Sequence, residues 1–339
     1  MNRIGAKLTL ALLAGLLWPY GSALAQRPMP PVPRVPRPAV TAAPAVLADG
    51  ESKLATAPNV NLKFCISDGD LRINGWDRNE VRVFVRNGRE FTLKVLEKNS
   101  AGQPNWVWVA AETDGPASRA PMSECLTGSD VEMDVPTGAT LNITGRSTDT
   151  VIDSVRKASV KILEGNLALR NVDGGIEAAA FQGDITVENS AGAIMIESTT
   201  GNLLAFDVSP GQIGDLFRAK TNSGAITMQK VAHRQIEANS ITGSVLFDGG
   251  FLAGGIYGFK TSNGSIRILI PERSSCNVTA AYGWGSFNSE LPMKFTYRNE
   301  TSRAKNLAGV IGAGESCNLN LTTNSGSINI LRPETSKGP

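Results

Sequence analysis

The sequence predicts an all-β solenoid, a fold in which short strands wind into stacked coils. Three observations predict it: a nearly constant spacing of strand starts, a glycine that recurs before strands, and alternation of apolar and polar residues within the strands. A fixed short period is typical of a chain that stacks on itself. The first apolar residues of seven successive strands are spaced by 9, 7, 9, 9, 9 and 9 residues: Val151, Val160, Leu167, Ile176, Ile185, Ile194 and Leu203.

The repeat unit consists of a polar turn, a glycine and a strand with two inward apolar residues. Clear copies begin at Gly183, Gly224 and Gly264. Glycine suits this place because a turn between short strands needs positive φ. Alternate residues of a strand point to opposite faces, so Ile185 and Val187 are expected in the core. One coil per 18 to 21 residues fits both the nine-residue spacing and the wider spacing after residue 226.

A helix competes with strands in one segment. Val151, Val155, Ala158 and Ile162 also fit one face of a helix. Their agreement with the nine-residue phase favours strands.

The residues before the repeats divide into three segments. Residues 1–25 are expected to be a cleaved signal peptide, with a basic start, ten apolar residues from Leu8 to Leu17 and the cleavage site Ala23-Leu-Ala25. Residues 26–58 form a proline-rich linker. It is either a spacer that binds no partner or a basic segment that binds an anionic envelope polymer. Residues 59–145 alternate like strands and form a β-rich N-terminal region. The solenoid spans residues 146–332, a disordered tail covers 333–339, and no transmembrane anchor is expected in the mature chain.

The cysteines of an exported chain are expected to be oxidised. Four cysteines allow three pairings. Cys65 with Cys125 and Cys276 with Cys317 is favoured, because each pair brackets one irregular region at an end of the repeats. A zinc site is the alternative, but the chain has no CxxC motif and one histidine. No metal site and no cofactor are therefore predicted.

Several motifs resemble the bacterial putative-adhesin family of β-strand repeat proteins, which carries a domain of unknown function. They are Gly75-Trp-Asp-Arg78, Asp134-Val-Pro-Thr-Gly138 and the reiterated Ser-Gly-x-Ile-x-Ile strands. The resemblance covers about residues 60–332 and implies a right-handed β-helix-like fold and an exported location. It implies no catalytic residue. The wide spacing after Leu203 and the irregular segment between Cys276 and Cys317 depart from uniform coil geometry.

The candidate catalytic groups of the sequence are its carboxylates and its histidine. Glycosidic cleavage needs two facing carboxyl groups. The candidates are Asp173, Glu177, Asp184, Glu188 and Glu197, which are expected to be solvated on outward strand positions. His233 is expected in a surface loop, and no Gly-x-Ser-x-Gly motif accompanies it. The sequence therefore predicts that the protein is not an enzyme and has no catalytic residue.

Two sets of side chains have two interpretations each. Asn189, Asn222, Asn263 and Asn324 either form a hydrogen-bonded ladder along the stack or simply tolerate the turn conformation. Tyr282, Trp284 and Phe287 are candidate ligand-stacking residues, and Trp106 and Trp108 share one strand face. Both aromatic groups are favoured as caps over the ends of the core.

The composition argues against nucleic acid as a partner and does not identify another. With 33 basic and 31 acidic residues and 6% aromatic residues, the chain lacks the basic excess of nucleic-acid-binding proteins. The first function predicted is a non-enzymatic envelope or surface interaction module, binding envelope polysaccharide or another envelope protein. The alternatives are a periplasmic structural or envelope-stress module that binds another protein and, third, a polysaccharide-acting β-helix enzyme.

Overall fold

The computed structural model describes residues 50–86, 90–111, 125–127, 130–301, 304–313 and 317–333. All of them belong to one compact unit, Val46–Pro339. Every regular element among them is a β-strand, so the all-β prediction is confirmed and the helical interpretation of residues 151–162 is wrong. The predicted signal peptide, residues 26–49 of the linker and residues 334–339 of the tail lie outside the described residues.

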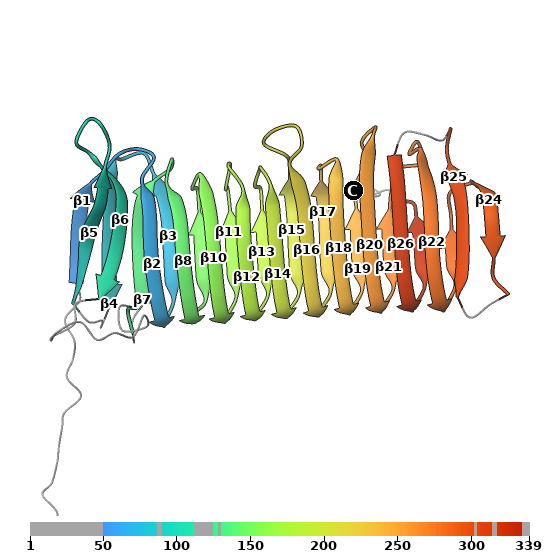
Figure 1. Cartoon of the computed structure of the whole chain (residues 1–339), viewed down its shortest axis with the longest axis horizontal. Coiled ribbons are helices and arrows are strands. Elements are labelled where there is room, and N and C mark those ends of the chain that lie inside the picture. Colours follow the sequence, from blue (N-terminus) through green and yellow to red (C-terminus); the bar gives the residue numbers. More distant parts are fainter. Residues whose placement is uncertain are drawn as a thin grey trace, which may run out of the picture. The chain divides into compact units, whose positions relative to one another are not determined.

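The strands form two large, mostly parallel sheets (Figure 1). In spatial order, the 13-stranded sheet contains β1 (Gly50–Ala55), β4 (Glu80–Arg86), β7 (Asp130–Pro136), β3 (Leu71–Trp76), β9 (Thr150–Asp153), β11 (Leu167–Arg170), β13 (Ile185–Glu188), β15 (Leu203–Val208), β17 (Ile226–Val231), β19 (Val245–Asp248), β21 (Ile266–Leu269), β27 (Ile328–Leu331) and β23 (Phe287–Ser289). The 14-stranded sheet contains β24 (Met293–Asn299), β25 (Lys305–Ile311), β22 (Cys276–Trp284), β26 (Cys317–Ser325), β20 (Gly255–Asn263), β18 (Gln235–Thr242), β16 (Leu216–Ser223), β14 (Ile194–Thr200), β12 (Ile176–Gln182), β10 (Lys157–Glu164), β8 (Thr140–Ser147), β2 (Asn61–Asp68), β6 (Pro104–Ala111) and β5 (Phe91–Lys98).

From β8 to β21 the chain alternates between the two sheets. Each strand pairs in parallel with the strand two later, as β10 pairs with β12 and β12 with β14. Val160, Ala178 and Ile196 are therefore neighbours in one inward row. The inward residues of both sheets meet in a continuous core, in which Ile185 and Val187 are fully buried as predicted.

A column of turn glycines joins successive coils. A Cβ atom on Gly183 would lie 1.8 Å from the carbonyl oxygen of Gly165, and one on Gly201 would lie 1.9 Å from that of Gly183. Gly183 also has a φ of +143°, which L side chains rarely adopt. Glycine recurs here because the turns stack too closely for any side chain.

Both ends of the stack contain strands out of sequence order. At one end, β2 lies between β6 and β8, and β3 lies between β7 and β9. At the other end, β26 lies between β20 and β22, and β27 lies between β21 and β23. Antiparallel strands extend the sheets beyond these coils: β1, β4 and β5 at one end, β24 and β25 at the other. Strand β1 lies inside the range 26–58 that the sequence assigned to the linker.

Two disulfide bonds join the pairs that the sequence favoured. Cys65 of β2 is bonded to Cys125, with their Cα atoms 4.6 Å apart. Cys276 of β22 is bonded to Cys317 of β26, with their Cα atoms 4.5 Å apart. Each bond ties a strand of an out-of-order coil to its neighbour, so both disulfides lie where strand order departs from sequence order.

Candidate interaction surface

The outer faces of the middle coils carry cross-strand ion pairs. On the 14-stranded sheet, Lys161 lies 3.5 Å from Glu177, Lys220 lies 3.5 Å from Glu197, and Arg218 lies 2.8 Å from Glu237. The opposite sheet has a similar pair, in which Arg170 Nε and Glu188 Oε2 are 2.9 Å apart. These eight charged side chains of the middle coils are therefore paired across strands.

Four of the five candidate catalytic carboxylates have polar contacts within the stack. Glu177, Glu188 and Glu197 are ion-paired, as above. Asp184 accepts a hydrogen bond from the backbone N–H of Asn202 at 2.7 Å. Asp173 lies in an exposed turn. Within the described ranges, no group of three His, Cys, Asp or Glu side chains is placed to hold a metal ion.

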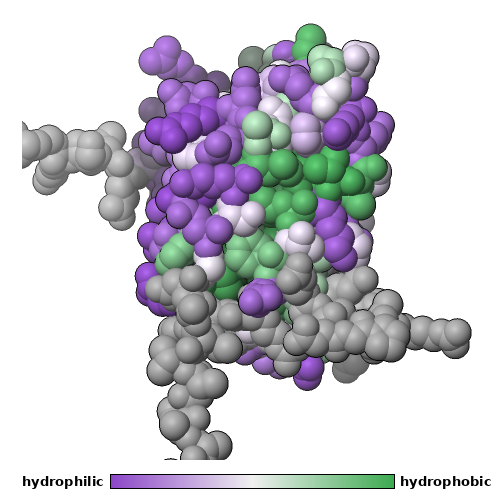
Figure 2. Space-filling view, turned by 90° about the vertical axis from the view of Figure 1, so that its left-hand side faces the viewer, coloured by the Kyte–Doolittle hydropathy of each residue, from purple (hydrophilic) through white to green (hydrophobic). Residues whose placement is uncertain are grey.

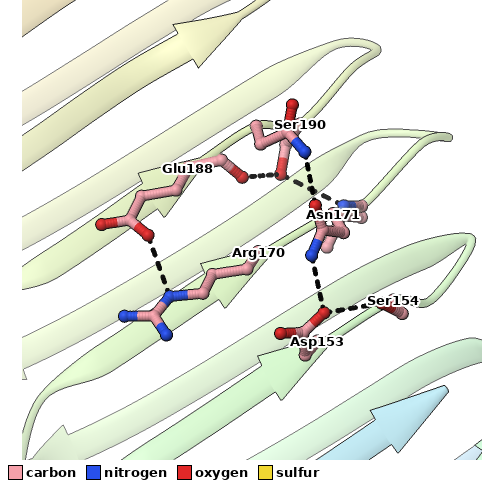
Figure 3. Close-up of polar contacts among 8 residues, drawn as sticks. Asp153, Ser154, Arg170, Asn171, Glu188 and Ser190 are labelled. Atoms are coloured by element: carbon pink, nitrogen blue, oxygen red, sulfur yellow. Dashed lines mark hydrogen bonds and ion pairs between the residues drawn. The ribbon is translucent and has the colours of Figure 1, made fainter.

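One polar ladder runs along the turns at the ends of β9, β11 and β13 (Figure 3). Asn171 Nδ2 donates to Asp153 Oδ1 at 2.8 Å, and Asn189 Nδ2 donates to Asn171 Oδ1 at 2.5 Å. The φ angle is 52° at Asn171 and 45° at Asn189. Asn189 therefore both takes part in a hydrogen-bonded ladder and adopts the turn conformation, so both interpretations from the sequence hold for it. No side-chain hydrogen bond among the described contacts links the other three predicted ladder residues, Asn222, Asn263 and Asn324.

A second ladder follows the turn glycines and was missed from the sequence. Asp149 accepts from the backbone N–H of Asn166 at 2.6 Å, Asn166 from that of Asp184 at 3.0 Å, and Asn202 from that of Ala225 at 2.9 Å. The signal was present as Asp or Asn directly after Gly165, Gly183 and Gly201.

A buried column of hydroxyl groups was also missed. Each hydroxyl donates to the carbonyl oxygen of a turn glycine in the adjacent coil, at distances such as 3.0 Å from Ser198 to Gly183 and 2.7 Å from Thr261 to Gly243. Every member stands three residues before a turn glycine, a spacing visible in the sequence. The members are Ser198, Thr221, Ser240, Thr261 and Thr323.

His233 is buried in the structure, so the prediction of a surface loop residue is wrong. Its side chain is fully buried, its Nε2 lies 2.8 Å from the carbonyl oxygen of Gly192, and its ring packs 5.9 Å from that of Phe217. Burial lowers its pKa, while the Gly192 contact and the charge of Asp215 oppose this shift. The preceding coil carries the longer loop 209–215, and His233 reaches past that coil to Gly192.

The candidate stacking residues near the far end of the stack differ in exposure. Tyr282 is buried and its hydroxyl donates to Glu300, so its ring is not available to a ligand. Burial, followed by the hydrogen bond to Glu300, raises the pKa of Tyr282 to about 12. Phe287 is half-buried, with its ring 6.5 Å from that of Phe295. Trp284 is 73% exposed and remains the one candidate of the three with a large open surface.

At the opposite end, Trp106 and Trp108 point outward from β6. The inward positions of this strand are taken by Val107 and Val109, which are fully buried. The two tryptophans therefore do not cover the end of the core, and the capping interpretation is wrong for them. Figure 2 shows an apolar area at this end, where the half-buried side chains of Leu54, Phe91 and Leu93 and the exposed Val95 and Leu96 lie.

Trp108 is the centre of a group of cations on the outer face of the 14-stranded sheet. The ammonium of Lys63, from β2, lies 4.6 Å from its ring centroid, and that of Lys94, from β5, lies 5.2 Å away. These strands flank β6, with Lys63 and Lys94 each directly opposite Trp108. Trp106 is 44% exposed beside them. We call Lys63, Lys94, Trp106 and Trp108 the tryptophan–lysine platform.

The tryptophan of the Gly-Trp-Asp-Arg motif has a local structural role. Trp76 Nε1 donates to the carbonyl oxygen of Glu80 at 2.8 Å. The guanidinium groups of Arg78 and Arg82 lie 5.0 and 5.9 Å from its ring centroid. These contacts hold the turn between β3 and β4.

No helix that could cross a membrane is found among the residues described. No protein-family model matches the chain. No curated protein matches it either.

Several solved structures are similar to this chain. One, a putative adhesin from Bacteroides fragilis NCTC 9343, is 10% identical, with 84% of this chain and 97% of that chain covered and a TM-score of 0.39. A putative adhesin from Parabacteroides distasonis ATCC 8503 is also 10% identical, with the same coverage and a TM-score of 0.31. A putative lipid binding protein from the same organism is 11% identical, again with 84% and 97% covered and a TM-score of 0.30. Putative adhesins are thus among the solved structures similar to this chain, and the sequence motifs resemble a family of that name.

Proposed function

We propose that this protein is an exported, non-enzymatic interaction module of the cell envelope or cell surface, which presents the outer face of a right-handed β-solenoid to its partner. The observation that carries the proposal is the regularity of the outer faces. Parallel strands in register place their outward side chains in straight rows, about 4.8 Å apart from strand to strand. Such rows suit repeated contact with an extended or repetitive partner.

The contacts between successive coils support a role as a rigid display surface. The polar ladders and the hydroxyl column connect consecutive coils through hydrogen bonds to side chains and to turn carbonyl groups. Satisfied polar networks of this kind make a structure more rigid. The two disulfides are typical of proteins outside the cytoplasm and support export.

Protease shaving of intact cells of the native host tests the location. An antibody against residues 59–332 is expected to lose its signal when intact cells are treated, while a periplasmic marker protein keeps its own. Protection of the signal until the outer barrier is opened would instead support the periplasmic structural module.

A panel of polysaccharides tests the non-enzymatic part of the proposal. The purified mature protein is expected to release no reducing ends from any of them. Release of reducing ends that is lost in the double variant E177Q/E197Q, which removes two carboxylates from paired strands on one outer face, would establish the polysaccharide-acting enzyme instead.

A further inference from the structure

The tryptophan–lysine platform has an unusual charge arrangement for this molecule. Lys63 and Lys94 lie over the same indole ring, 4.6 and 5.2 Å from its centroid, and neither forms an ion pair within the described part of the chain. By contrast, Lys161 and Lys220 on the same sheet each have a carboxylate within 3.5 Å. Because no carboxylate of the described residues neutralises either ammonium group, an acidic group of a ligand beside Lys63 or Lys94 would meet uncompensated positive charge.

The neighbouring strands add positive charge and polar groups. In register with Lys63 are Asn142 on β8 and, one strand further, Ser159 on β10. Lys157 of β10 lies in the row that also contains Trp106, and it too forms no ion pair within the described residues. Among the described residues of these rows, the carboxylate is Glu97, opposite Trp106 on β5. The described side chains of the platform and its neighbouring rows therefore carry more positive than negative charge.

The aromatic groups supply the second half of a recognition surface. Trp106 and Trp108 are two residues apart on one face of β6, so they are separated by about 7 Å along the strand. Trp106 is 44% exposed, and no aromatic or cationic side chain of the described residues stacks on its ring. The apolar face of a sugar ring can lie on such an indole, because its C–H groups meet the negative face of the aromatic system.

We propose that the platform binds an anionic polysaccharide, with a sugar ring against Trp106 and the acidic groups of the polymer at Lys63 and Lys94. This inference rests on the proposed interaction function and names its ligand class and its place on the fold. The chain would run across the strands, from β5 over β6 and β2 toward β8. In that direction the row through Trp108 offers Lys94, the indole ring, Lys63 and the amide of Asn142 at the constant spacing of the strands. Trp106 lies in the adjacent row, so a sugar ring on it would sit beside these cations.

Binding of the full mature protein to defined polymers tests the proposal. Titration calorimetry at low salt with polygalacturonate, dextran sulfate and neutral dextran separates carboxylate, sulfate and uncharged ligands. We expect binding to at least one anionic polymer, no binding to neutral dextran, and weaker affinity as salt is raised. K63Q/K94Q is expected to bind about tenfold more weakly, because two exposed charge pairs are lost. W106A is expected to weaken binding as well.

Two substitutions elsewhere serve as matched controls. Phe181→Ala removes an exposed aromatic side chain from β12 of the same sheet, and Lys220→Gln removes an ion-paired lysine from that sheet. Both are expected to bind like the unaltered protein. Thermal melting checks that every variant folds, and K63E/K94E, which reverses the charge, is expected to abolish binding.

Three results would overturn the proposal: no binding to either anionic polymer, equal binding of K63Q/K94Q and the unaltered protein, or tighter binding to phosphatidylglycerol vesicles or single-stranded DNA than to any polysaccharide. The shaving experiment does not depend on these titrations. A surface-exposed protein with an inactive platform would therefore refute the ligand and leave the interaction function standing.

Discussion

Gly183→Ala tests whether the turn glycines are required by close stacking. Two separate costs are expected at this position. The φ of +143° is unfavourable for alanine, by about 1–3 kcal/mol. The added Cβ would also lie 1.8 Å from the carbonyl oxygen of Gly165, so the two coils must separate locally.

The local separation would weaken the hydrogen bonds of this turn. Between these two coils, the N–H of Gly165 donates to the carbonyl oxygen of Gln182 at 2.9 Å, and that of Leu167 donates to the carbonyl oxygen of Asp184 at 2.9 Å. Each such bond contributes about 1 kcal/mol. The total loss in free energy of unfolding is therefore on the order of 3–5 kcal/mol.

Urea unfolding, followed by circular dichroism and by tryptophan fluorescence, measures this loss. With an m-value of about 3 kcal/mol/M, the midpoint is expected to fall by about 1 M or more. Gly214→Ala is the matched control, since Gly214 has a φ of +98° but no atom within 4 Å of its added Cβ. It isolates the conformational cost. If G183A is no less stable than G214A, the stacking argument is refuted.

Three further predictions use the same unfolding measurements. Burial lowers the pKa of His233, so the unfolded chain binds a proton at a higher pH than the folded chain does, and the free energy of unfolding should fall as the pH drops below about 6.5. His233→Gln should make the free energy of unfolding less dependent on pH. Equal slopes in both proteins would contradict this prediction. Asn171→Gly keeps the positive φ but removes the ladder contacts and should cost about 1 kcal/mol, whereas Asn171→Ala should cost more; equal losses would show that the turn conformation contributes nothing. Replacing Cys276 and Cys317 by serine opens a link between residues separated by 41 positions and should cost about 4 kcal/mol, and an unchanged melting temperature would argue against it.

The middle of the fold was predictable because its signals are local. The nine-residue spacing, the turn glycines and the alternation in segments such as 185–188 each describe one coil and repeat in the next. The disulfide pairing followed from the two irregular regions that the cysteines bracket. Neither prediction required knowledge of contacts between distant segments.

The ends and the candidate surface depended on long-range contacts that no local pattern encodes. Strand β26 pairs between β20 and β22, although its sequence resembles that of any other strand of the repeats. Its sequence therefore does not indicate which strands it pairs with. His233 is buried because the neighbouring coil carries a longer loop. Alternation showed that Trp106 and Trp108 share a face, but the burial of Val107 and Val109 decided that this face is the outer one.

The out-of-order coils have a consequence for length variation in this architecture. Coils between β10 and β20 contact only the coils before and after them, so a unit of about 18 residues can be gained or lost there without changing other pairings. The last strands cannot be treated in this way. Removing β26 and β27 would leave a gap inside each sheet, between β20 and β22 in one and between β21 and β23 in the other. The strands on the two sides of each gap do not pair with each other. Shortening the protein from its C-terminal side should therefore split the stack rather than trim it, and the tolerant place for adding or deleting repeats is its middle.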